Sequence, residues 1–191
     1  MINEEYFYDF PVFETARLIL RKIELEDAAD IQAIRSDQKV MTYMDSYEHK
    51  TLEDSEKFIS EGLQRYDSQK GLFWGLVEKS SKEFIGDFSF WRIDRKNSRA
   101  EIGYTLKPQY WGKGYMKEAM LRLITFGFDD LNLHSLEANI NPGNENSRNI
   151  LLKLGFKKEG YFRENYFYNG KYLDSEIYSL LKKDFIEQGS F

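Results

Sequence analysis

Cysteine is absent from this sequence of 191 residues, histidine occurs only twice and proline only three times. Without cysteine the chain can form no disulfide, no thiolate metal site and no cysteine nucleophile. The two histidines, His49 and His134, lie far apart and lack the spacing of metal ligands, so we expect no bound metal.

Long apolar runs and an excess of basic residues are missing as well. No run approaches the ~18 apolar residues of a membrane span. The segment from Met1 to Glu14 has neither the basic nor the apolar region of a signal peptide. Lys and Arg number 27 against 32 Asp and Glu, which gives a net charge of -5 and disfavours a general attraction to DNA. We therefore expect a cytoplasmic protein that binds neither DNA nor a membrane.

Helical and strand patterns run along the whole chain, without a linker, a repeat or a low-complexity tract. Strands are expected over residues 17–23, 71–79, 84–93, 100–106 and 134–141. Helices are expected over residues 24–37, 52–66, 115 onward and 144–155, with Thr51 and Asp54 as a capping box. Asn169-Gly170 is typical of a hairpin turn. The predicted fold class is α/β (α+β) with a long antiparallel component, in one domain over residues 1–191.

The stretch LKPQYWGKGYMKEAM places Gly112 and Gly114 directly before a helical pattern that begins at Tyr115. Glycine tolerates positive φ and close approach to the backbone, and a helix N-terminus offers free N–H groups to an anion. The stretch fits neither the P-loop pattern nor the dinucleotide pattern G-x-G-x-x-G, which would need a glycine where Lys117 stands. The two glycines alone do not decide between a phosphate site and a tight turn without a ligand.

The residues in front of these glycines favour the phosphate site. Gln109-Tyr110-Trp111-Gly112-Lys113-Gly114 fits the pattern Q/R-x-x-G-x-G/A and resembles the acetyl-CoA pyrophosphate loop of the GNAT superfamily of N-acetyltransferases. The stretches 14–31, 100–120 and 141–164 are similar, in the same order, to the Rim-type ribosomal-protein N-acetyltransferase branch of that superfamily. The resemblance spans residues 13–185, nearly the whole chain.

This resemblance implies a GNAT-like fold, in which a splayed, mixed but mainly antiparallel sheet is flanked by helices. The strand at 101–106 and the strand at 135–141 are then expected to part and open a V-shaped cleft. Acetyl-CoA is the implied cosubstrate. The residues expected to bind it are Ile102, Tyr104, Thr105, Leu106, Gln109, Tyr110, Trp111, Gly112, Lys113, Gly114, Tyr115 and Asn144. For Asn144, a plain turn residue is the alternative.

The resemblance also implies two catalytic residues, Glu101 and Ser147. Glu101 stands where the family often has a carboxylate that deprotonates the amine, and an ordinary ion-paired glutamate is the alternative. Many members protonate the CoA thiolate with a tyrosine in L-Y-x-x-L-G-F, but this chain has Leu151 at that position. The Rim-type branch tends to place a serine at the start of this helix, where Ser147 stands; an N-cap role is its alternative.

The acceptor is judged from the cost of forming a free amine, because only the free base attacks a thioester. At pH 7 this costs about 4.6 kcal/mol for a lysine-type amine and about 1 kcal/mol for an α-amine. Together with the resemblance, this favours direct transfer to a protein or peptide N-terminal amine. A polyamine or antibiotic acceptor and a non-catalytic acyl-CoA sensor are the alternatives, and a homodimer is left open. Tyr43, Met44 and Trp91 are the residues expected near the acceptor.

Overall fold

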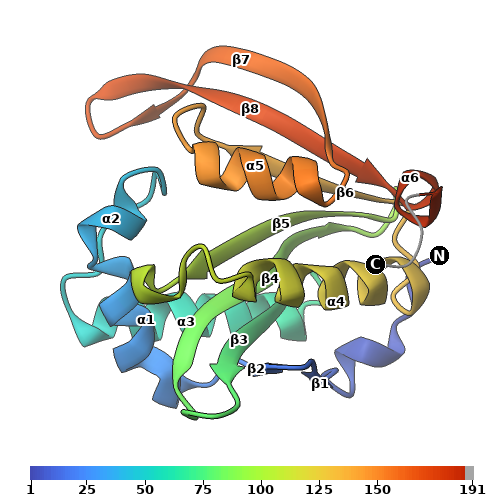
Figure 1. Ribbon diagram of the computed structural model, residues 1–191, viewed down its shortest axis with the longest axis horizontal. Coiled ribbons are helices and arrows are strands. Elements are labelled where there is room, and N and C mark those ends of the chain that lie inside the picture. The colour runs from blue at the N-terminus through green and yellow to red at the C-terminus, as the bar shows by residue number, and fades with distance from the viewer. Residues whose placement is uncertain (188–191) are drawn as a thin grey trace.

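The computed structural model describes residues 1–187, which form helices packed on one eight-stranded sheet (Figure 1). The strand order is β1-β2-β3-β4-β5-β6-β8-β7. The strands are β1 Phe13–Glu14, β2 Leu18–Lys22, β3 Leu72–Glu78, β4 Phe84–Asp94, β5 Arg99–Leu106, β6 Ser135–Ile140, β7 Lys157–Tyr168 and β8 Lys171–Leu181. The helices are α1 Ala28–Arg35, α2 Gln38–Met41, α3 Leu52–Asp67, α4 Tyr115–Asp129, α5 Glu145–Lys153 and α6 Lys182–Glu187, with 3-10 turns η1 Glu5–Phe7, η2 Leu25–Asp27 and η3 Pro108–Tyr110.

The sheet divides between β5 and β6. These two strands are parallel, whereas the other neighbouring strands of the sheet are antiparallel. They pair only at Arg99–Ser135, Ala100–Leu136 and Glu101–Glu137, and then separate. The expected splayed, mixed and mainly antiparallel sheet is confirmed, and the strands that part are the two expected ones.

The central strand β3 shows why the sheet carries helices on both faces. All seven of its residues are buried. Leu72, Trp74 and Leu76 belong to the apolar cluster that includes α4, whereas Phe73 and Val77 pack with residues of α1 and α3. Such alternation follows the two-residue period of a strand. Figure 1 accordingly shows α4 on one face of β3 and β4, with α1 and α3 on the other.

The part of the molecule beyond the gap consists of β6, β7, β8 and α5, which lies above β5 in Figure 1. Leu151 and Leu154 of α5 and the following turn are fully buried in the main apolar cluster. Leu151, which stands where many members of the resembled family have a tyrosine, therefore contributes to packing, and this position offers no proton donor.

A polar bridge joins the two parts at one end of the gap. Asp45, in the loop after α2, accepts hydrogen bonds from Asn141 Nδ2 at 3.2 Å and from the hydroxyl of Tyr166 on β7. Tyr168 Oη donates to the Ser46 carbonyl at 2.6 Å. Figure 1 shows α2 and the β7–β8 hairpin approaching each other at this end. The two parts are thus joined by paired strands at one end and by this bridge at the other.

Local signals in the sequence fix several ends of these elements. Thr51 Oγ1 accepts from the Asp54 N–H at 3.2 Å, and Asp54 accepts from the Thr51 N–H at 2.9 Å, so the expected capping box begins α3. Asn169 and Gly170 have φ values of 47° and 79°, as the tight turn between β7 and β8 requires. Both local predictions are confirmed.

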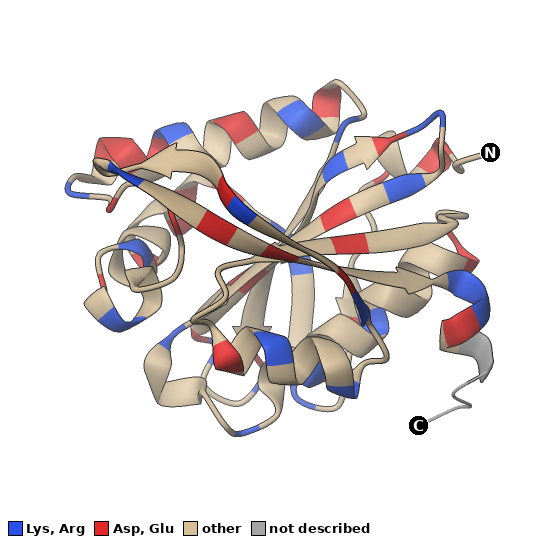
Figure 2. Cartoon of the chain, turned by 90° about the horizontal axis from the view of Figure 1, so that it is seen from above, with Lys and Arg blue, Asp and Glu red and all other residues tan. Residues whose placement is uncertain are grey.

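The surface of the described residues carries both signs of charge. In the view of Figure 2, basic and acidic residues are interspersed along the helices and strands. No helix within residues 1–187 is long and apolar enough to cross a membrane.

Candidate active site

A cleft of about 1240 Å³ extends from the parted strands toward α1 and α3. Of the predicted site residues, those that line it are Glu101, Ile102, Tyr104, Thr105, Leu106, Tyr110, Trp111, Gly112, Gly114, Tyr115, Asn144 and Ser147. Gln109 and Lys113 lie outside this lining, whereas Tyr43, Met44 and Trp91 are part of it. In the described residues, no group of three or more histidines and carboxylates could hold a metal ion.

The loop before α4 is shaped to admit an anion at its backbone. Gly112 and Gly114 have φ values of 72° and 81°, in the left-handed region that favours glycine. A Cβ on Gly112 would meet nothing within 4 Å, so the space beside it is open. Gly114 is the N-cap of α4 and has no side chain to accept from the first N–H groups of that helix, unlike Thr51 at α3. An open space beside uncapped N–H groups fits a phosphate.

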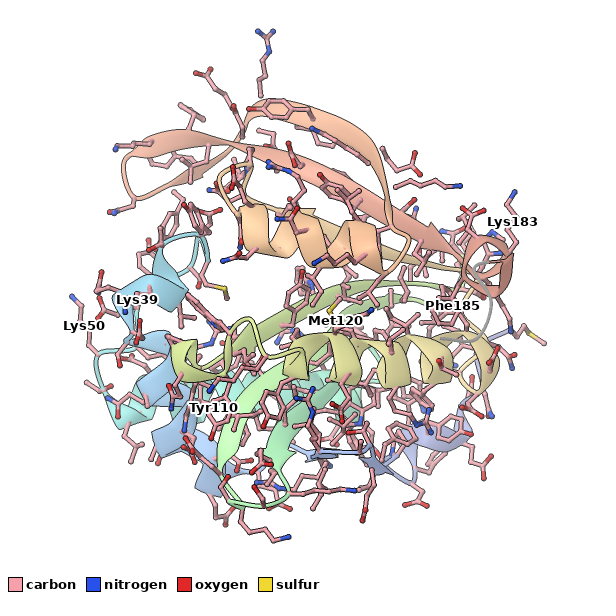
Figure 3. All side chains as sticks on the ribbon, in the orientation of Figure 1. Lys39, Lys50, Tyr110, Met120, Lys183 and Phe185 are labelled. Carbon is pink, nitrogen blue, oxygen red and sulfur yellow. The ribbon has the colours of Figure 1, made fainter. Side chains whose placement is uncertain are left out.

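The side chains in front of the glycines anchor the loop to the body of the protein. Tyr110 Oη donates to Glu83 at 2.6 Å, and Gln109 Nε2 donates to the same carboxylate at 3.4 Å. Figure 3 shows Tyr110 below the loop, away from α5. Trp111 Nε1 donates to the Leu106 carbonyl at 2.7 Å. These side chains hold the loop in place and leave the backbone to meet a ligand.

Arg17 is a second anchor of the loop, and sequence reasoning did not identify it. Its Nη1 donates to the Lys113 carbonyl at 2.9 Å and its Nε donates to Glu118 at 2.7 Å. The guanidinium also lies 4.1 Å from the centre of the Tyr115 ring. Arg17 precedes β2 and is 96 residues from Lys113, so no local pattern could have revealed the contact. It holds the strand β2 that follows it, the loop and the first turn of α4 together.

The edge of β5 that faces the gap offers backbone groups in a regular series. The N–H of Lys107, which follows β5, donates to the Ile85 carbonyl of β4 at 2.8 Å. Because backbone groups alternate in direction along a strand, those of Ile102, Tyr104 and Leu106 point to the opposite edge, where β6 has moved away. The Leu106 carbonyl already accepts a hydrogen bond from Trp111. The backbone groups of Ile102 and Tyr104 therefore form the middle of the edge that faces the gap.

Glu101 sits at the point where the two strands part. Its side chain is only 11% exposed and lies 3.4 Å from Arg92 Nη1 on β4. Burial raises the pKa of the Glu101 carboxyl, Arg92 opposes this shift, and the negative charge of Glu137 adds to it. The strand β4 bulges at Trp91, where the register shifts between Phe90 and Arg92. Glu101 is thus a confined carboxylate with a raised affinity for a proton, on the face of β5 that leads toward α1 and α3.

Ser147 meets Tyr104 across the gap, with 2.5 Å between the two hydroxyl oxygens. Burial raises the pKa of Tyr104 to about 12, so its phenol keeps its proton at neutral pH. The Ser147 N–H donates to Asn144 Oδ1 at 3.0 Å, which makes Asn144 the N-cap of α5. The alternative reading of Ser147 as the N-cap is therefore wrong, because the helix begins two residues before it. Its hydroxyl is directed to Tyr104 on β5.

Comparison with known proteins matches residues 17–157 to the family model described as an acetyltransferase (GNAT) domain. The chain is 36% identical over 173 residues to the uncharacterized N-acetyltransferase YoaA of Bacillus subtilis, with 91% of this chain and 98% of that protein covered. It is 24% identical over 173 residues to the spermidine N(1)-acetyltransferase of Vibrio cholerae, with the same coverage of 91% and 98%. A crystal structure of ribosomal-protein-S5-alanine acetyltransferase from Vibrio fischeri has a TM-score of 0.80 and 27% identity, covering 92% of this chain and 98% of that one. The matched range contains both parted strands, the glycine loop and α5.

Proposed function

The chain belongs to the GNAT acetyltransferase family and is an N-acetyltransferase that uses acetyl-CoA, and on this premise we propose that its acceptor is a protein or peptide N-terminal amine. We place it with the Rim-type ribosomal-protein branch, to which the similar Vibrio fischeri structure lends support. We further propose that residues 1–191 form a single N-acetyltransferase domain and that the protein acts in the cytoplasm.

We propose that acetyl-CoA binds in the gap between β5 and β6. Its pyrophosphate would lie on the backbone from Gly112 to Tyr115, at the uncapped start of α4. Its pantetheine arm would add to the free edge of β5 at Ile102 and Tyr104, as an extra strand does. Asn144 would face the arm from the start of α5. When bound, acetyl-CoA supplies the acetyl thioester, and the chain supplies orientation and the handling of protons.

The main observation that supports an N-terminal amine as the acceptor is the confined carboxylate of Glu101. An α-amine needs only about 1 kcal/mol to lose its proton at pH 7, whereas a lysine-type amine needs about 4.6 kcal/mol. A single carboxylate whose pKa is raised by burial suits the first task, because a general base works best with a pKa near the working pH. We propose that Glu101 receives the proton of the amine, directly or through one water molecule.

The departing thiolate must be stabilised, and we propose that Ser147 donates a hydrogen bond to its sulfur. Tyr104 is protonated at neutral pH and lies within hydrogen-bond distance of Ser147 Oγ. If Tyr104 donates to this oxygen, the proton of Ser147 is free to point toward the sulfur. Asn144 already caps the helix, so the position of Ser147 does not depend on its own hydroxyl.

Replacing Ser147 with alanine is expected to lower kcat about 10- to 100-fold, because a hydrogen bond to a charged group is worth about 1.5–3 kcal/mol. The KM for acetyl-CoA should change little, since α5 keeps its cap. Steady-state kinetics on Ser147→Ala would measure kcat and KM. Ser147→Thr, which restores a hydroxyl, is the control. A wild-type kcat in Ser147→Ala would remove Ser147 from the mechanism.

The proposed function is tested by measuring thiol release from acetyl-CoA with a panel of acceptors. The panel contains peptides with free N-termini, the same peptides with blocked N-termini, polyamines and aminoglycosides. Release that requires a free peptide N-terminus supports the proposal. Release with spermidine and not with peptides would establish the alternative, to which the 24% identical spermidine N(1)-acetyltransferase lends support.

A further inference from the structure

A buried arginine without a carboxylate partner lies in the wall of the cleft. Arg35 is the last residue of α1, is only 7% exposed and lines the cleft. Its Nη1 reaches Ser46 Oγ at a long 3.5 Å, and the Nε atom has no hydrogen-bond partner among the described residues. No carboxylate within residues 1–187 lies within 4.0 Å of this guanidinium, as the ion pairs of the chain show.

The position of this guanidinium is fixed by its surroundings. It lies 3.8 Å from the centre of the Phe58 ring on α3, in a cation–π contact. The Arg35 carbonyl accepts from the His49 N–H at 3.1 Å, which ties the end of α1 to the start of α3. The His49 side chain faces Ser55 at 2.9 Å, and burial together with the charge of Arg35 lowers its pKa to about 4. The neighbouring imidazole is therefore neutral at pH 7 and does not compete with Arg35 for an anion.

The acidic group on this wall whose charge acts on Arg35 is Asp87, and it is hydrogen-bonded elsewhere. Asp87 is 3% exposed on β4 and accepts a hydrogen bond from Thr105 of β5. Burial raises its pKa to about 6, while the charge of Arg35 opposes this shift. The two opposite charges influence each other without forming an ion pair. Buried charges in proteins are usually paired, because an isolated one is costly, so this arrangement is incomplete without an anion from outside the chain.

The distance between Glu101 and the Arg35 region indicates which residue of a peptide acceptor would carry that anion. Thr105, opposite Asp87, lies four residues along β5 from Glu101, which is about 13 Å at the usual rise of a strand. Glu101 and Thr105 are on the same face of β5, since side chains two residues apart share a face. An extended peptide rises at the same rate, so its fourth or fifth residue would reach the Arg35 region when its amine is at Glu101.

We propose that Arg35 binds a carboxylate of the acceptor and so makes the enzyme selective for peptides with an acidic side chain at the fourth or fifth residue. Arginine presents a planar fork of donors that matches a carboxylate. The same charge repels the second ammonium group of a polyamine. This inference rests on the proposed function, because it takes the acceptor to be a peptide with its N-terminal amine at Glu101.

The test uses pairs of peptides that differ only by Glu or Gln at the fourth or the fifth residue. The wild-type enzyme should show a kcat/KM ratio, Glu over Gln, of about tenfold or more at one of these positions. In Arg35→Gln the ratio should fall to about one. Each ratio is measured within one enzyme preparation, so a smaller folded fraction does not change it. If Arg35→Gln does not fold, Arg35→Lys, which keeps the charge and loses the fork, should show a reduced ratio.

A matched control removes one positive charge from the same region without touching the cleft. Lys50 is exposed, lies outside the lining and points away from the molecule in Figure 3. Lys50→Gln should keep the wild-type ratio. The role of Arg35 is overturned if the Glu-over-Gln ratio of kcat/KM is about one in the wild-type enzyme. It is also overturned if the ratio in Arg35→Gln is as high as in the wild type.

Calorimetric titration of the same peptides into the protein with CoA separates this inference from the proposed function. Tighter binding of the Glu peptide, without thiol release, would support Arg35 and count against the proposed acetyl acceptor. Thiol release with equal affinity for the Glu and Gln peptides would support the acceptor class and overturn the role of Arg35. Binding of neither peptide counts against both.

Discussion

Replacing Glu101 with glutamine is expected to lower kcat/KM for a peptide amine by about 10²–10⁴-fold at pH 7, the usual loss when a general base is removed. The affinity for CoA should be retained, because Glu101 acts through its side chain and the β5 backbone is unchanged. The loss should shrink as the pH rises above the amine pKa of about 8, where the acceptor is already a free base. Kinetics between pH 5 and pH 9 would measure both effects.

The wild-type profile adds a second check on Glu101. Burial raises the pKa of this carboxyl above its ordinary value, so activity should fall as the pH drops through this raised pKa and the base becomes protonated. Glu137→Gln is the matched control, because Glu137 is the direct strand neighbour of Glu101 and pairs with Arg99 at 2.7 Å. If both variants lose activity equally, or if the Glu101→Gln loss is the same at every pH, the assignment of the base fails.

Replacing Gly112 with valine is expected to weaken CoA binding by up to about 30-fold. A side chain at φ 72° costs about 1–2 kcal/mol in backbone strain, and it also occupies the open space beside the first N–H groups of α4. An anion at a helix N-terminus contributes up to about 2 kcal/mol, and each 1.4 kcal/mol is tenfold in affinity. Isothermal calorimetry with CoA would measure the change.

The matched control for this variant lies in the hairpin turn. Gly170 has a φ of 79° and, like Gly112, nothing within 4 Å of a Cβ. Gly170→Val should therefore carry similar backbone strain and a similar loss of thermal stability, with wild-type affinity for CoA. Wild-type affinity in a folded Gly112→Val would show that the pyrophosphate lies elsewhere.

Signals within a few neighbouring residues predicted much of this structure. The two glycines, the capping box of Thr51 and the Asn169-Gly170 turn each act within one turn of chain, so their geometry could be inferred from the sequence. The parting of β5 and β6 came from the family resemblance and not from any pattern of spacing. In the structure, alternate residues of β3 pack against helices on opposite faces of the sheet. Only the structure identifies which helices cover each face.

Contacts between distant residues explain what the sequence did not reveal. The hydrogen bond from Arg17 to Lys113 and the one from Tyr166 to Asp45 join residues that are 96 and 121 positions apart. The four residues of α2 are too few to show a helical period. The isolation of Arg35 was equally hidden, because a missing ion pair depends on where every carboxylate of the chain is placed.

The brief contact between β5 and β6 would let the cosubstrate add to the stability of the folded protein. Three residue pairs hold these strands, and in the proposed binding mode acetyl-CoA would act as the absent strand. A ligand at 100 times its Kd that binds only the folded state adds about 2.7 kcal/mol to the free energy of unfolding. Unfolding followed by proteolysis would then slow when acetyl-CoA is abundant. The amount of enzyme in the cell would thereby follow the supply of its acetyl donor, without any change in gene expression.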